Sequence, residues 1–325
     1  NLLTEFTREI RNDFKKSSHL LEYGLIFLIA VFLILNLIGA MSPPNAADAL
    51  VYHLSIPKLY IKENQLIDIP FNIRSYLPLN IEMLFTAGML IYSDITAKLL
   101  NFFIGVLVLF SIYGFSKRYF NSQIGLVAVA IFLSFPLTTN LITTASTDLG
   151  ATLFFALTLF SFLIYMENRK VNWLLLASVF AGFTAGTKLQ PIFLIISLGG
   201  LYLIKILIDT EWRTKREFLL WISFGVLAIL ISSPWYIKNF IQTGNPVYPF
   251  FYSLFGGSNW SSPLSILQET NILAKAPGYN LETFLSTPWR FTVQSASFGD
   301  LGFFFLAFLP LAIIVRKSRW LSINI

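Results

Sequence analysis

The sequence contains no cysteine, and only 12% of its 325 residues are charged. Without cysteine, this chain forms neither disulfide bonds nor thiolate metal sites. Soluble globular proteins carry about 25% charged residues, because such residues cover their surface. The low proportion of charge therefore excludes a soluble globular protein and indicates that most of the surface faces lipid.

Apolar residues take the place of the missing charge. Hydrophobic residues make up 55% of the chain, and the 33 phenylalanines and 13 tyrosines suit positions that face lipid or the membrane surface. The net charge is +6, but the basic residues are spread in small groups between apolar runs. That distribution is typical of topology signals in membrane proteins and argues against a nucleic-acid-binding surface.

Eight apolar runs are long enough to cross a membrane, which takes about 20 residues of helix. They are residues 20–40, 95–115, 122–141, 148–166, 171–187, 190–208, 217–234 and 299–315. A further run, 78–92, is short and contains Glu82, so we expect it to form a re-entrant or surface-lying helix. The sequence thus predicts an all-α polytopic membrane protein with about eight transmembrane helices and surface-lying amphipathic helices in its first outer loop.

The distribution of lysine and arginine predicts the orientation of these helices, because cytoplasmic loops are enriched in both residues. With a cytoplasmic N-terminus and no crossing at 78–92, 14 of the 23 lysines and arginines lie on the cytoplasmic side. If 78–92 crossed, ten of those 14 would move outside. We therefore expect a cytoplasmic segment, 1–19, and one membrane domain, 20–325, with large outer loops at 41–94 and 235–298. Since the chain begins without methionine and stops just past an apolar run, we also expect further sequence at both ends.

The first outer loop opens with the stretch "NAADALVYHLSIPKLYIKENQ", residues 45–65. As a helix begun by its asparagine cap, this stretch would place Asp48 and Tyr52 on one face, one turn apart. Lys58 and Lys62 follow near its end. The pattern predicts an amphipathic helix at the lipid boundary, with a carboxylate near its start and ammonium groups near its end.

This arrangement suits the transfer of a sugar that is carried on a membrane lipid phosphate. Such a reaction needs a carboxylate base for the acceptor hydroxyl and cations for the departing phosphate. Lys58, Lys62, Arg74 and Lys188 are the candidate cations. A simpler interpretation of Lys58 and Lys62 is that they only extend to lipid headgroups.

Two further ionisable residues fall on the same predicted side of the membrane. Asp148 lies at the outer end of a span, where it could support Asp48 or could merely begin a helix whose dipole favours an acid. Lys188 lies in a short outer turn between two spans. An ionisable residue there is a functional candidate by default, although it could also anchor the turn at the interface.

The remaining candidates are a lysine, an asparagine and a histidine. Lys238 and Asn239 stand at the start of the second outer loop, where they could meet a lipid phosphate or a sugar. His53 neighbours Asp48, and the only other histidine, His19, precedes the first span. A single imidazole cannot build a metal site, so no ligand spacing supports a metal, although a divalent ion stays open.

Six stretches of the sequence, taken in chain order, carry a resemblance to a known family. They are "DALVYHLSIPKLY", "LPLNIEMLF", "AKLLNFFIGVLVLFSIY", "STDLGATLFF", "AGFTAGTKLQP" and "PWYIKNFIQTGNPVYPFFYSLFGGSNW". Together they resemble the polytopic lipid-linked-sugar glycosyltransferases of the GT-C superfamily. More narrowly, they are similar to its bacterial branch of protein-mannosyltransferase-like and aminoarabinose-transferase-like enzymes.

The resemblance implies a cytoplasmic N-terminus, a large first outer loop with surface-lying helices, and a polyprenyl-phosphate sugar as donor. It implies that Asp48 is the base or orienting acid, that Asp148 is the second acid, and that Lys188 is the lysine of the following outer turn. It also implies a bacterial inner membrane. The paired-acid metal motif and the outer C-terminal domain of many members are not evident, which leaves metal dependence and the acceptor open.

Three hypotheses for the function follow. The leading one is a transferase that moves a sugar from polyprenyl phosphate to an acceptor on the outer membrane face. Its partners would be the donor, membrane lipids and an unidentified acceptor, with no nucleic acid. The second is a non-catalytic subunit of a larger membrane complex, since a fold does not imply a function. The third is a transporter, which the small number of charges within the spans disfavours.

Overall fold

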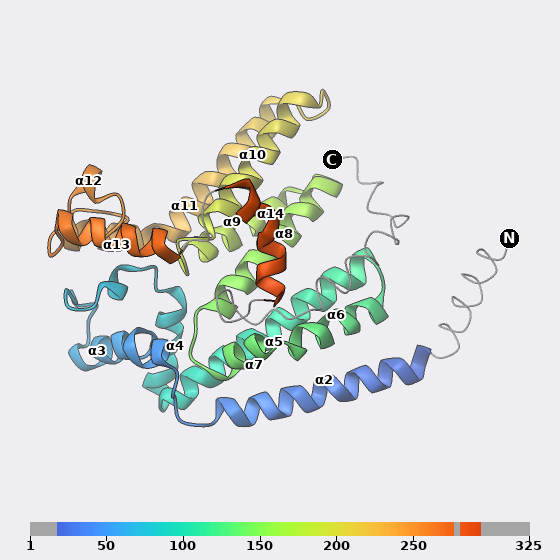
Figure 1. Ribbon diagram of the computed structural model, residues 1–325. Coiled ribbons are helices and arrows are strands. Elements are labelled where there is room, and N and C mark those ends of the chain that lie inside the picture. The colour runs from blue at the N-terminus through green and yellow to red at the C-terminus, as the bar shows by residue number, and fades with distance from the viewer. Residues whose placement is uncertain (1–17, 276–279, 294–325) are drawn as a thin grey trace.

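The computed structural model describes residues 18–275 and 280–293, and every regular element in these residues is a helix (Figure 1). Four of the helices are long and apolar enough to span a membrane. These are α2 (Ser18–Ala40), α5 (Asp94–Tyr119), α8 (Asp148–Asn168) and α11 (Lys215–Thr243). The described part of the chain is therefore all-helical, and the protein is an integral membrane protein, as the sequence predicts.

Two shorter helices meet at a sharp bend where the sequence predicts one span, 122–141. α6 (Ser122–Ser134) and α7 (Pro136–Thr143) lie at 77° to each other. The bend falls at Pro136, because proline lacks an amide N–H and disfavours helical geometry in the residue before it. Phe135 accordingly has an extended backbone, with φ −73° and ψ 127°. Counted as one broken span, the pair would be a fifth crossing.

The other predicted spans are shorter than expected or fall elsewhere. α9 (Val171–Ala185) and α10 (Ile192–Ile208) have 15 and 17 residues. Both are short for a helix that must cross about 30 Å of hydrocarbon at about 1.5 Å per residue. The predicted span 299–315 lies outside the described residues. Length and composition thus support four or five crossings, and the larger total of eight stays a prediction.

α11 continues well past Pro234, where the sequence predicts the end of the span. It ends at Thr243, followed by Gly244 with a φ of +78°. Glycine adopts this left-handed conformation without a steric cost, which makes it a common residue just after a helix. The extra turns carry Trp235, Lys238 and Asn239, which contact the first long loop.

The first long loop contains four short helical elements, and the stretch 45–65, predicted as one amphipathic helix, is divided into the first two of them. They are η1 (Ala49–His53), α3 (Ser55–Glu63), η2 (Ile73–Tyr76) and α4 (Asn80–Ile91). The second long loop contains α12 (Tyr252–Phe255), α13 (Ser262–Lys275) and α14 (Leu281–Val293). Figure 1 shows α3, α4, α12 and α13 toward the same side of the molecule.

Buried polar side chains of α5 fix the ends of its neighbours. Lys98 is 1% exposed, and its Nζ donates to the backbone oxygens of Ser42 at 2.6 Å and Gly39 at 3.2 Å. Asn101 donates from Nδ2 to the backbone oxygens of Leu141 at 2.7 Å and Thr144 at 2.6 Å. These bonds hold the end of α2 and the segment that leads into α8 close to α5.

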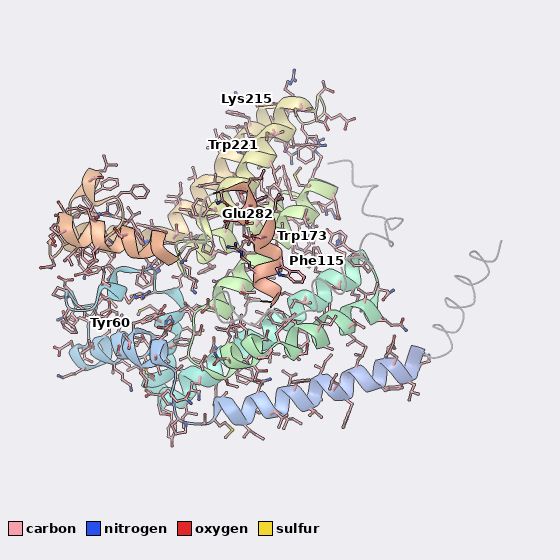
Figure 2. The ribbon with its side chains drawn as sticks, in the orientation of Figure 1. Tyr60, Phe115, Trp173, Lys215, Trp221 and Glu282 are labelled. Carbon is pink, nitrogen blue, oxygen red and sulfur yellow. The ribbon has the colours of Figure 1, made fainter. Side chains whose placement is uncertain are left out.

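A second buried polar cluster lies at the other end of α8. Glu217 is fully buried and accepts hydrogen bonds from the hydroxyls of Tyr165 and Tyr202, the latter at 2.8 Å. Arg169 and Arg216 pair with its other oxygen at 3.3 and 3.1 Å. Because Tyr165 lies 17 residues after the start of α8, this cluster is about 25 Å along the helix from Asp148. Figure 2 shows Lys215, at the start of α11, well apart from Tyr60 of the first long loop.

Candidate functional site

The segment that carries Asp48 and Tyr52 is a π-turn. The backbone N–H of Leu54 bonds to the oxygen of Ala49 at 2.9 Å, five residues earlier. A π-helix holds more residues per turn than an α-helix, and single π-turns occur frequently at functional sites. Residues four and five positions apart therefore face similar directions, so Tyr52 and His53 both lie on the side of Asp48.

The Tyr52 hydroxyl lies within electrostatic range of both acids that the sequence singles out. Burial raises the pKa of this half-buried tyrosine, and the Asp48 carboxylate raises it further. Asp148 adds a smaller effect in the same direction, while Arg74 opposes it. The Arg74 guanidinium lies 5.1 Å from the centre of the Tyr52 ring, within the range of a cation–π contact. One phenol thus brings Asp48, Asp148 and Arg74 into a single cluster.

Asp148 is the first residue of α8, and both oxygens of its carboxylate have partners. Its Oδ1 pairs with the Lys188 ammonium at 2.5 Å, and its Oδ2 accepts from the Ser146 hydroxyl at 2.7 Å. The side chains of Asp148 and Lys188 are 46% and 29% exposed. The charge of Asp148 is also favoured by the N-terminal end of the helix dipole. Lys188 therefore neutralises an acid of the cluster and leaves Asp48 as its exposed carboxylate.

The other predicted phosphate ligands differ in their surroundings. Lys58 pairs with Asp94 at 2.6 Å, at the start of α5. Lys62 is exposed in the last turn of α3, and no described residue bonds to it. Lys238 donates from Nζ to the backbone oxygen of Ser75 at 2.5 Å. Of these three lysines, Lys62 alone is exposed without a partner in the described part of the chain.

Lys238 and Asn239 bond to the backbone of η2 instead of facing an open surface. Asn239 donates to the backbone oxygen of Tyr76 at 2.6 Å, beside the bond from Lys238 to Ser75. Both bonds hold η2, the turn that carries Arg74. The two residues therefore fix the position of Arg74 against α11.

Sequence reasoning missed two residues of α4 that contact the site. Asn80 accepts from the indole N–H of Trp235 at 2.7 Å, and its backbone N–H donates to Gly186 at 3.0 Å, two residues before Lys188. Glu82 bonds to Nδ1 of His53 at 2.8 Å, with both side chains about 5% exposed or less. The sequence does contain a signal for Glu82, because an acid inside an apolar helix is a functional candidate. The prediction from sequence uses Glu82 for topology alone.

The cluster has the groups that a transfer reaction at a membrane surface would use. An exposed carboxylate stands beside a phenol and a guanidinium, and a neutralised acid–lysine pair lies next to them. In the described residues, no group of three histidines, cysteines or acids lies close enough together to hold a metal ion. The residues present therefore do not outline a metal site of their own.

Comparison with known proteins gives one family match. Residues 78–237 match the family described as dolichyl-phosphate-mannose-protein mannosyltransferase. No curated protein and no solved structure matches the chain. The matched stretch includes Glu82, Asp148 and Lys188, whereas Asp48 and Tyr52 precede it. The resemblance that the sequence predicts is thus confirmed over these residues, and the protein is a membrane protein similar to the GT-C glycosyltransferases.

Proposed function

We propose that the protein transfers a sugar from a polyprenyl-phosphate donor to an acceptor at the outer face of the membrane. The observation that carries this proposal is the meeting of Asp48, Tyr52 and Arg74 with the Asp148–Lys188 pair. The family match supports the reaction type, since a lipid-linked mannosyl donor is part of that family's description. Asp148 begins α8, a helix that is long and apolar enough to span a membrane, which supports a position of the cluster at the membrane boundary, where the phosphate of a lipid donor would lie.

Each residue has a role in the proposed step. The acceptor oxygen attacks the anomeric carbon, and the bond from that carbon to the phosphate oxygen breaks with its electron pair on the phosphate. Asp48 takes the proton of the acceptor hydroxyl, as a general base. Arg74 stabilises the charge on the departing phosphate, with Lys62 as a second cation. Asp148 supports the cluster and is held by Lys188 and Ser146.

The proposed orientation places this cluster outside and the N-terminal segment in the cytoplasm of a bacterial cell with the helices in its inner membrane. Basic residues support it. Arg118 ends α5, Arg169 ends α8 and Arg216 begins α11, all at the helix ends opposite to the cluster. Positive charge collects on the cytoplasmic side of membrane proteins, so the cluster would face the other way.

The proposal is tested by sugar release from a panel of radiolabelled polyprenyl-phosphate sugars, with purified protein and an acceptor mixture. We expect Asp48→Asn to lower the transfer rate at least a hundredfold, while donor binding stays within about twofold, because general-base catalysis contributes about 10²–10⁴-fold. The matched control is Asp209→Asn, which removes an acid between α10 and α11, near the Glu217 cluster. Transfer by Asp48→Asn at the wild-type rate would exclude Asp48 as the base.

A second candidate function is a non-catalytic subunit, and one observation favours it. Three of the five predicted phosphate ligands, Lys58, Lys188 and Lys238, already bond to protein groups. That leaves Arg74 and Lys62 for a donor phosphate. Co-purification with other subunits in fixed stoichiometry, without turnover of any donor in the panel, would support this function instead.

A further inference from the structure

Three consecutive residues of α4 contact the three segments that carry the candidate site. Asn80 bonds to Gly186, in the turn that carries Lys188. The side chain of Ile81 packs on Gly150, just after Asp148, so closely that a Cβ added at Gly150 would lie 2.5 Å from it. Glu82 bonds to His53, in the π-turn of Asp48 and Tyr52. The start of α4 therefore contacts both parts of the site, which are the π-turn of Asp48 and Tyr52 and the segments that carry the Asp148–Lys188 pair.

The contact between Glu82 and His53 is buried and specific. Glu82 is 3% exposed and His53 is 4% exposed. Because a carboxylate oxygen accepts the bond, the imidazole carries a proton on Nδ1, which fixes the orientation of the ring. The ring centres of His53 and Tyr52 are 4.0 Å apart, and His53 also lies close enough to Asp148 to interact with its charge. The histidine thus contacts Tyr52 and lies within electrostatic range of Asp148.

Glu82 would lower the stability of the protein if packing were its only role. A buried carboxylate loses its hydration, and its Oε2 has no hydrogen-bond partner in the described residues. An apolar residue of similar size would fill the same space without this cost. Glu82 nevertheless forms a side-chain hydrogen bond from α4 to the π-turn, which points to a role in holding that turn.

We propose that Glu82 and His53 are positioning residues that set the π-turn, and with it Asp48 and Tyr52, against the Asp148–Lys188 pair. This inference rests on the proposed transferase function and deepens it. A π-turn is a rare conformation that needs its surroundings to select it. Without the bond from Glu82, the segment 49–53 is free to return to ordinary α-helical geometry, which shifts His53 and Tyr52 relative to Asp48 and Asp148.

The kinetic test separates positioning from donor binding. We expect Glu82→Leu to lower kcat at least tenfold with the donor KM within about twofold, because misplacement of reacting groups is costly while phosphate contacts are unchanged. Glu82→Gln keeps an oxygen that accepts from Nδ1 and should recover at least a third of kcat. His53→Gln should lower kcat as Glu82→Leu does, and the double variant should be no worse than either single one.

The control is Glu63→Gln, which removes an exposed acid at the end of α3. A kcat of Glu82→Leu within twofold of wild type, or additive losses in the double variant, would overturn the proposal.

A second measurement does not depend on activity. The chain has no cysteine, so Leu50→Cys and Gln190→Cys provide the only two sites for spin labels, one on the π-turn and one on the Lys188 turn. Both positions are exposed. We expect a narrow distance distribution that Glu82→Leu broadens or shifts and Glu82→Gln largely restores. An unchanged distribution in Glu82→Leu would overturn the positioning role even if no donor is turned over. Absence of turnover in the wild type, with the expected change in distance, would instead count against the transferase function.

Discussion

At the scale of single residues, three tyrosines of the first long loop are kept neutral by their surroundings. Burial raises the pKa of Tyr52, Tyr60 and Tyr76, and a nearby acid raises each further. For Tyr76 that acid is Asp68, which accepts from its hydroxyl at 2.6 Å. A neutral phenol at Tyr52 can donate to Asp48 and leave that carboxylate ionised, which is the form a general base needs.

These tyrosines predict how stability depends on pH. An unfolded tyrosine has a pKa of about 10, and the folded values here lie above it. Their contribution to stability is therefore fully present below about pH 10 and is lost progressively as the pH rises through the folded values, since only the unfolded state releases the protons at first. Thermal unfolding in detergent between pH 8 and about 11 should show this fall, and Tyr60→Phe should reduce it. A constant unfolding temperature over that range would contradict the prediction.

The roles of the lysines follow from their partners more than from their positions in the sequence. The sequence predicts Lys58, Lys62 and Lys238 alike as ligands of a lipid phosphate on the outer side of the membrane. Lys58 is paired with Asp94 and Lys238 with a backbone oxygen, whereas Lys62 is exposed. The partner of Lys58 is 36 residues away and that of Lys238 is 163 residues away, so no local pattern could identify them.

At the scale of elements, α4 is a short apolar helix that joins distant parts of the chain. Its sequence, with Glu82 in the first turn, predicts a helix that does not cross the membrane, and its 12 residues are too few for a straight crossing. What the sequence leaves open is why the helix is there. The contacts of Asn80, Ile81 and Glu82 give it a structural purpose, which is to hold the site segments together.

Asn80 gives the sharpest test of this element. Asn80→Ala removes the acceptor of the Trp235 indole and the donor to Phe183, bonds of 2.7 and 3.2 Å. Leaving the buried indole N–H of Trp235 without its acceptor should cost about 1–3 kcal/mol of stability, whereas the bond to Phe183 is exposed and its oxygen still accepts from Thr187. Thermal unfolding in detergent measures this loss, with the exposed Asn45→Ala as the matched control. Equal unfolding temperatures for the two variants would show that α4 is held by apolar packing alone.

At the scale of the whole molecule, two polar clusters occupy opposite ends of α8. The cluster around Asp148 is partly exposed, whereas Glu217 at the other end is fully buried among two tyrosines and two arginines. The buried cluster joins α8, α10 and α11, and Trp212 stacks under Arg169 at 4.4 Å. We interpret the Asp148 cluster as the site of the reaction and the Glu217 cluster as a structural contact that holds α8, α10 and α11 together.

That division predicts different consequences for the two ends. Glu217→Ala leaves the buried hydroxyls of Tyr165 and Tyr202 without their acceptor and should lower stability by about 1–3 kcal/mol. Arg169 and Arg216, in contrast, are 35% and 58% exposed and can turn to water. The transfer rate per folded molecule should not change, because the cluster lies about 25 Å along α8 from Asp148. Unfolding temperature and kcat, measured on the same preparation and compared with Glu211→Ala, check both parts. A fall in kcat without loss of stability would show that the two ends are coupled.

The sequence by itself determines the class of this protein, since a chain with so few charges and so many long apolar runs can fold only in a membrane. It also predicts the helical architecture and most helix starts, because hydrophobic runs and capping residues act over short distances. Its order of motifs predicts the resemblance to lipid-linked-sugar glycosyltransferases, which the family match confirms for residues 78–237.

The tertiary structure alone decides which of the predicted residues meet. The break at Pro136 has a local cause in the proline itself, but the continuation of α11 past Pro234 to Thr243 depends on packing that a window of sequence does not contain. The π-turn at 49–53 is another such feature, because the bond that supports it comes from Glu82, 29 residues away from His53. Contacts over such distances are set by the arrangement of whole helices, and for that reason the partners of Asp148, Lys238 and His53 could not be derived from local pattern.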